Sequence, residues 1–153
     1  MTDTEATPIE LDLGGEKVDG LVLRPANAWA MLVFAHGAGA DMRHSFMDKM
    51  SRALAGVGIA TLRYQFPFAQ RGGRRPDPRP VLVETAHAAI MLAETLAPDL
   101  PLLAGGKSMG GRMTSLAEAE EQSATVKGIV FFGFPLHASG KPGTSRAEHL
   151  ILI

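Results

Sequence analysis

Hydrophobic and polar positions follow a strand-like pattern over the first part of the chain. Residues 9–13 alternate between apolar and acidic side chains, the pair Gly14-Gly15 interrupts them, and a second apolar stretch occupies residues 18–23. This order is typical of a β-hairpin. Residues 31–35 then form a continuous apolar run, which is the pattern of a strand buried on both of its faces.

Two longer segments repeat apolar residues at helical spacing. The first begins near Ser45 and ends at the glycines that flank Val57, and the second runs from Pro80 to Leu96. Ser45 followed three residues later by Asp48 has the pattern of a capping box, so we expect Ser45 to cap the first helix. Proline suits the beginning of a helix because its missing N–H would have no acceptor there.

Three further strands are expected at residues 59–64, 100–104 and 126–134, and a further helix between the last two, ending near Gln122. Strands therefore alternate with helices from residue 30 onward. Such alternation predicts parallel strands joined by helical crossovers, with helices on both faces of the sheet. We predict a single α/β domain over residues 1–153.

Composition and charge exclude several classes of function. The formal net charge is -1, so no overall field favours nucleic acid or a membrane surface. The chain has no cysteine and no histidine pair at metal-ligand spacing, so we expect no metal site and no cofactor. The polar, acidic start at residues 1–5 does not resemble a secretory signal, and we expect a cytoplasmic protein without a membrane span.

The chemistry-bearing motif is Gly106-Lys107-Ser108-Met109-Gly110. It follows an apolar strand and begins a helix, which is the context of a nucleophile elbow. A serine at such an abrupt turn takes a strained backbone conformation, and glycine is needed two residues away on either side because a Cβ would strike the neighbouring strand. A phosphate-binding loop is excluded, because Pro101 occupies the position where that motif needs its first glycine.

A second element agrees with the first. His36-Gly37-Ala38-Gly39 ends the buried strand at residues 31–35, where a loop has to bring a backbone N–H close to a developing oxyanion. His36 itself is expected to order this loop, and contact with substrate is the second interpretation of its ring.

These motifs resemble the α/β-hydrolase fold. The motifs that carry the resemblance are residues 34–39, the following helix, residues 106–112 and residues 132–137, and the resemblance covers most of residues 18–149. It is nearest to small bacterial proteins similar to dienelactone hydrolases and to the hydrolase-like domain of an NSL histone-acetyltransferase complex subunit. It implies a three-layer sandwich with strand order 1-2-4-3-5-6. The catalytic acid and histidine of that family follow strands seven and eight, whereas this chain ends after strand six.

Carried over by position, the resemblance implies that Ser108 is the nucleophile and that the N–H groups of Ala38 and Met109 form the oxyanion hole, with Gly106 and Gly110 as the elbow glycines. The implied function is serine hydrolysis of an ester, lactone or related small acyl substrate. The alternative is a non-catalytic hydrolase-like module that binds a partner, because a fold does not fix a function.

Other side chains are candidates for binding substrate. Arg74 and Arg75 lie in a basic loop after the strand at residues 59–64, where they are either solvated or bind an anionic group. His137 follows the last strand, on the side where sites form in parallel sheets. Finally, the uncharged apolar segment 128–132 would form an open sheet edge, so we expect self-association unless the tail covers it.

Overall fold

A computed structural model describes residues 4–153, so residues 1–3 of the acidic N-terminus lie outside the described part of the chain. The elements follow in the order β1 (Thr7–Asp12), β2 (Lys17–Leu23), β3 (Ala30–Ala35), α1 (Ser45–Gly56), β4 (Ile59–Tyr64), α2 (Pro67–Gln70), α3 (Arg79–Leu96), β5 (Leu102–Lys107), α4 (Met109–Glu120), β6 (Val126–Phe132) and the 3₁₀ helix η1 (Ser145–Leu152).

The strands form one six-stranded sheet in the order β1-β2-β4-β3-β5-β6, which confirms the expected order. β1 and β2 form the antiparallel hairpin, β2 is antiparallel to β4, and β3 is parallel to both β4 and β5. All six residues of β3 are buried, as its continuous apolar character predicts.

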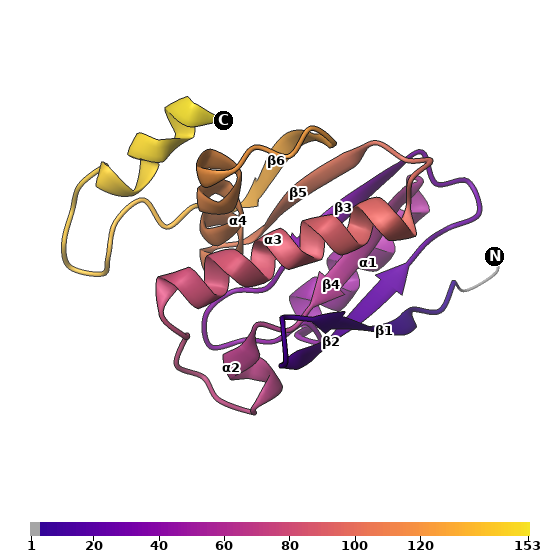
Figure 1. The fold of residues 1–153 in the computed structure, drawn as a ribbon, viewed down its shortest axis with the longest axis horizontal. Coiled ribbons are helices and arrows are strands. Elements are labelled where there is room, and N and C mark those ends of the chain that lie inside the picture. Colours follow the sequence, from indigo (N-terminus) through magenta and orange to yellow (C-terminus); the bar gives the residue numbers. More distant parts are fainter. Residues whose placement is uncertain (1–3) are drawn as a thin grey trace.

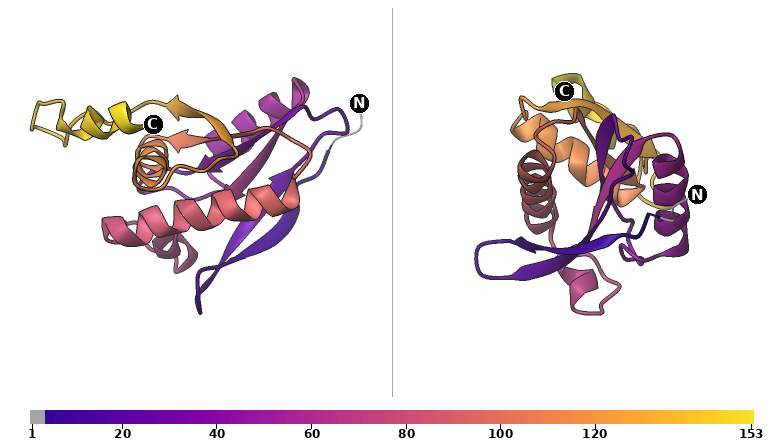
Figure 2. Two further views of the ribbon diagram at one scale, coloured as in Figure 1. Left: turned by 45° about the horizontal axis from the view of Figure 1, so that its top comes forward. Right: turned by 90° about the vertical axis from the view of Figure 1, so that its right-hand side faces the viewer.

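Helices cover both faces of the sheet, so the fold has three layers (Figures 1 and 2). Alternate side chains of β3 point into two separate cores. Leu32 and Phe34 pack with Met47 of α1 on one face, while Met31 and Val33 belong to the larger core beneath α3 and α4. The two-core arrangement explains why β3 has no polar position.

The capping box predicted at the start of α1 is wrong. His44 is the N-cap, and its ring nitrogen Nδ1 accepts a hydrogen bond from the N–H of Phe46 at 3.2 Å. Asp48 does not return to the helix start, because its carboxylate is bound by Arg52 at 3.0 Å and lies 3.4 Å from Arg63 of β4. Arg52, one turn further along α1, and Arg63 of β4 thus bind the side chain that the local pattern assigns to the cap.

Two strand ends and one helix also differ from the prediction. β5 does not end at Ala104 but continues through Gly105 and Gly106, whose backbones pair with β3 and β6. The predicted strand ended too early because glycine has low strand propensity. Glycine is needed at position 105 all the same, because a Cβ there would lie only 1.9 Å from the carbonyl oxygen of Val130. β6 ends at Phe132 rather than residue 134, and the loop after β4 contains the short helix α2.

β6 is the last strand at one edge of the sheet (Figure 1). The C-terminal segment after it, drawn in yellow, returns η1 to the side of α4. No helix among residues 4–153 is both long and apolar enough to cross a membrane.

Candidate functional site

Ser108 occupies an abrupt strand-to-helix turn. β5 ends at Lys107, α4 begins at Met109, and Ser108 between them has φ 52° and ψ -115°. Within residues 4–153 it is the only residue other than glycine with a positive φ. Its N–H donates to the carbonyl oxygen of Phe132 at 3.2 Å, so β6 holds the turn from one side. Backbone strain of this kind costs about 1–3 kcal/mol and is found mainly at functional sites.

The elbow glycines allow α4 to approach β3 closely. A Cβ at Gly106 would lie 2.4 Å from the carbonyl oxygen of Ala35, and one at Gly110 would lie 2.4 Å from that of His36. Both contacts are with backbone atoms of the buried central strand or its immediate end, which cannot move aside cheaply. The two positions that the motif reserves for glycine are therefore the ones where a side chain has no room.

The loop after β3 lies directly against the turn. A Cβ at Gly37 would be 3.3 Å from the carbonyl oxygen of Lys107 and 3.9 Å from the Cβ of Ser108. The next residue, Ala38, is exposed. Met109 is the first residue of α4, and an N–H at that position has no acceptor within its own helix. The structure thus brings together three of the residues predicted for the site.

The ring of His36 is completely buried and bridges two backbone groups. Its Nε2 accepts a hydrogen bond from the N–H of Phe66 at 3.1 Å, so Nδ1 carries the proton and donates to the carbonyl oxygen of Gly37 at 2.8 Å. Burial lowers the pKa of His36 and favours this neutral form. The structure supports the loop-ordering role of His36 and gives its ring no surface for a substrate.

No histidine of the described chain is bound to the Ser108 hydroxyl. His137 is exposed after β6, with Nδ1 donating to the carbonyl oxygen of Ala138 at 2.9 Å. His149 lies 2.7 Å from the hydroxyl of Ser115, which is seven residues along α4 from Ser108, and no local pattern in the sequence predicts this pairing. Burial, then the charges of two arginines, lower the pKa of His149. No metal-binding cluster occurs among residues 4–153.

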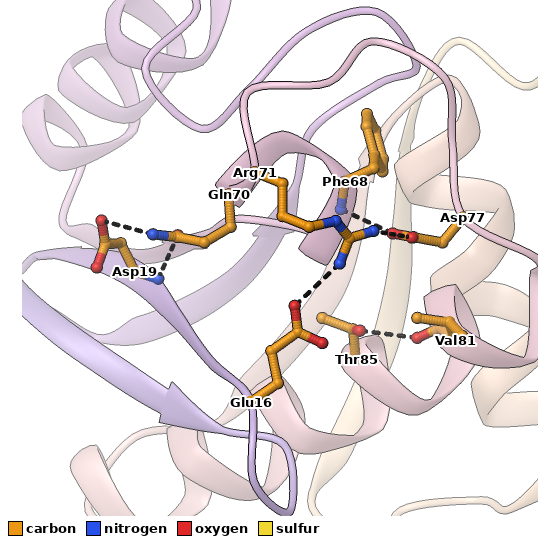
Figure 3. A network of polar contacts seen from close by, with 8 residues as sticks. All are labelled: Glu16, Asp19, Phe68, Gln70, Arg71, Asp77, Val81 and Thr85. Carbon is orange, nitrogen blue, oxygen red and sulfur yellow. Dashed lines mark hydrogen bonds and ion pairs between the residues drawn. The ribbon is translucent and has the colours of Figure 1, made fainter.

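The basic loop after β4 is partly neutralised. Arg71 binds Glu16 at 2.9 Å and also pairs with Asp77, whose carboxylate accepts the N–H of Phe68 at 2.7 Å (Figure 3). Arg74 and Arg75 are exposed and form no ion pair with another described residue. These two side chains are therefore the cations that the loop leaves to solvent.

Comparisons with known proteins agree with the fold. A family model described as an alpha/beta hydrolase domain matches residues 28–153. No curated protein matches the chain.

Solved structures with the same fold include three hydrolase-type proteins. The dienelactone hydrolase from Anabaena variabilis has 22% identity and a TM-score of 0.74, with 85% of this chain and 63% of that chain covered. Est1E from Butyrivibrio proteoclasticus has 20% identity and a TM-score of 0.66, covering 78% and 48%. An alpha-beta serine hydrolase homologue from Coxiella burnetii has 20% identity and a TM-score of 0.63, covering 80% and 60%.

This chain therefore spans between 48% and 63% of the length of those three proteins. The resemblance to the hydrolase-like domain of an NSL-complex subunit stays a prediction. The order of the strands, the turn at Ser108 and the match over residues 28–153 lead to one conclusion. The chain belongs to the alpha/beta hydrolase domain family.

Proposed function

We propose that this chain carries the nucleophile and the oxyanion hole of a serine hydrolase acting on esters, lactones or related acyl compounds. The observation that carries the proposal is the backbone of Ser108, which holds a strained φ of 52° at the strand-to-helix turn. Such strain persists only where the surroundings impose it, and it directs the hydroxyl away from the turn. The shared fold of the dienelactone hydrolase and the serine hydrolase homologue supports the substrate class.

In the proposed reaction a base takes the proton of the Ser108 hydroxyl as its oxygen attacks the acyl carbonyl. The protonated base then gives that proton to the departing alcohol, which leaves an acyl-enzyme. The N–H groups of Met109 and Ala38 would bind the oxyanion that develops on the former carbonyl oxygen. Two features support this assignment: Met109 is the first residue of α4, and Gly37, next to Ala38, lies so near the turn that a Cβ on it would be 3.9 Å from the Cβ of Ser108. Removing one such donor costs about 10²–10³ in rate in serine proteases. Water then hydrolyses the acyl-enzyme.

Among the described residues, no side chain is placed to act as a general base for the Ser108 hydroxyl. An unassisted serine hydroxyl is a poor nucleophile at neutral pH. This observation favours the second candidate, a hydrolase-like module that binds an acyl ligand or partner without turning it over. The two candidates differ in whether Ser108 reacts.

The experiment is covalent labelling of the folded chain with a fluorophosphonate, followed by peptide mapping. We expect slow labelling at Ser108 that free imidazole accelerates, because imidazole can act as an external base. Ser108→Ala should abolish labelling. Ser115→Ala is the matched control, because Ser115 is buried on the same helix and bonded to His149. A folded chain that stays unlabelled with imidazole would favour the binding module.

A further inference from the structure

Both ends of the oxyanion loop, residues 37–41, are hydrogen-bonded to the segment that ends β4. At one end, the N–H of Phe66 donates to the ring of His36 at 3.1 Å. At the other end, Met42 is bound on both of its backbone groups. Its N–H donates to Oε1 of Gln65 at 3.0 Å, and its carbonyl oxygen accepts from the guanidinium of Arg63 at 3.0 Å.

The sheet register explains why these groups meet. β3 and β4 run parallel and pair up to Ala35 opposite Tyr64, so the residues that follow both strands emerge at the same edge of the sheet. The backbone of Gln65 is fixed in turn by its own N–H, which donates to the carbonyl oxygen of Asp19 at 2.9 Å. Gln65 and Arg63 are therefore held by the sheet rather than by the loop.

The contacts at Met42 are shielded from solvent. Met42 has no exposed surface, Arg63 is 2% exposed and Gln65 is 9% exposed. Water cannot easily replace a partner lost at such a site, and an unpaired buried backbone group is costly. Arg63 is itself oriented by Asp48, whose carboxylate lies 3.4 Å from it. The contacts therefore fix Met42 more firmly than exposed hydrogen bonds would.

Between its two ends the loop has little to hold its shape. Ala38 is exposed, and Gly39 has a φ of 70°, which glycine adopts without cost. Asp41 binds only a local group, the N–H of Arg43 at 2.7 Å. The position of the Ala38 N–H relative to Ser108 thus depends on the fixed points at either end of the loop.

We propose that Gln65 and Arg63 are positioning residues for the oxyanion hole, acting through the two backbone groups of Met42. This inference rests on the proposed function, because it gives the loop a catalytic task. Neither residue touches the substrate. Their effect is to hold the Ala38 N–H where the oxyanion forms.

The test replaces Gln65 by methionine, which has similar length but no amide acceptor. With free imidazole present as the external base, we expect kcat for a p-nitrophenyl ester to fall about 10- to 100-fold, since a donor displaced by about 1 Å loses much of its transition-state effect. KM should change less than about threefold, because the loop binds charge that develops only in the transition state. Rates are taken per reactive site, counted by fluorophosphonate labelling carried to completion.

Gln70→Met is the matched control. Gln70 also accepts a backbone N–H through Oε1, that of Asp19 at 2.8 Å, but it lies on α2 and not at the loop (Figure 3). Its replacement should leave kcat within about twofold of the wild type. Gln65→Glu keeps an acceptor oxygen and should restore most of the kcat that Gln65→Met loses.

Amide hydrogen exchange supplies a readout that does not depend on activity. Exchange at residues 37–42 should accelerate in Gln65→Met and not in Gln70→Met. Unchanged exchange, or equal kcat in the two methionine variants, would overturn this inference while leaving the proposed function intact. A wild-type chain that shows no Ser108 labelling even with imidazole would overturn the proposed function, and the exchange comparison would still decide whether Gln65 holds the loop.

Discussion

The close approach of α4 to β3 permits a direct test of the elbow geometry through Gly110→Ala. The new Cβ would lie 2.4 Å from the carbonyl oxygen of His36 and 2.7 Å from that of Ala35. Both oxygens belong to backbone that is fully buried, so the clash cannot be relieved by a side-chain rotation. Overpacking usually lowers the free energy of unfolding by about 1–3 kcal/mol. Because these contacts are short and the backbone is rigid, we expect a loss of about 3 kcal/mol, at the upper end of that range.

Urea unfolding followed by circular dichroism measures this loss, and thermal unfolding provides a second estimate. For a chain of this size, about 3 kcal/mol corresponds to a fall in Tm of roughly 6–12 °C. Gly56→Ala is the control, because a Cβ there meets nothing within 4 Å and alanine favours helix. A Gly110→Ala variant as stable as the wild type would show that α4 does not press on β3 in this way.

Four other consequences can be measured. Ser108→Gly should raise the free energy of unfolding by about 1 kcal/mol while removing reactivity, because glycine relieves the positive φ; lower stability would contradict the strain at this turn. Replacing both Arg74 and Arg75 by alanine should raise KM for an anionic ester more than for a neutral one, and equal effects would leave the arginines as solvated residues. Burial lowers the folded-state pKa of His36, so its contribution to stability is complete above the unfolded pKa of about 6.5 and declines as the pH falls below it. Comparing the pH dependence of unfolding between the wild type and His36→Gln isolates this contribution from that of His149. The uncharged edge strand at residues 128–132 should give concentration-dependent self-association in size-exclusion chromatography with light scattering, whereas a monomer at tens of micromolar with exchange-protected amides there would contradict it.

The features that sequence alone predicted are those set by local pattern. Six apolar residues in succession predict the central position of β3, because a strand covered on both faces needs no polar side chain, and all six are buried in the structure. The turn at Ser108 is predicted by glycines two residues away on either side, although the backbone oxygens that exclude a Cβ at Gly106 and Gly110 belong to Ala35 and His36, far earlier in the chain. In both cases the pattern that predicts the structure lies in neighbouring positions of the sequence.

The features that sequence did not predict depend on partners far along the chain. Arg63 stands in a strand pattern and becomes buried because Met42, 21 residues earlier, offers it a carbonyl oxygen. Gln65 begins a loop and has no local sign of its contact with the same residue. Asp48 has the spacing of a capping residue but binds Arg52 and Arg63 instead. No short-range rule states which of these partners will meet.

These two kinds of feature meet at the candidate site. Local sequence produces the strained turn at Ser108, but that turn supplies only the proposed nucleophile and the Met109 N–H of the proposed oxyanion hole. The second N–H comes from a loop after β3 whose own residues bind little, so its position has to be fixed from outside. β4 can do this because it is parallel to β3 and ends beside it, which places Arg63, Gln65 and Phe66 against the two ends of the loop. Under this proposal, parallel pairing of these strands is a condition for the oxyanion hole as well as for the sheet.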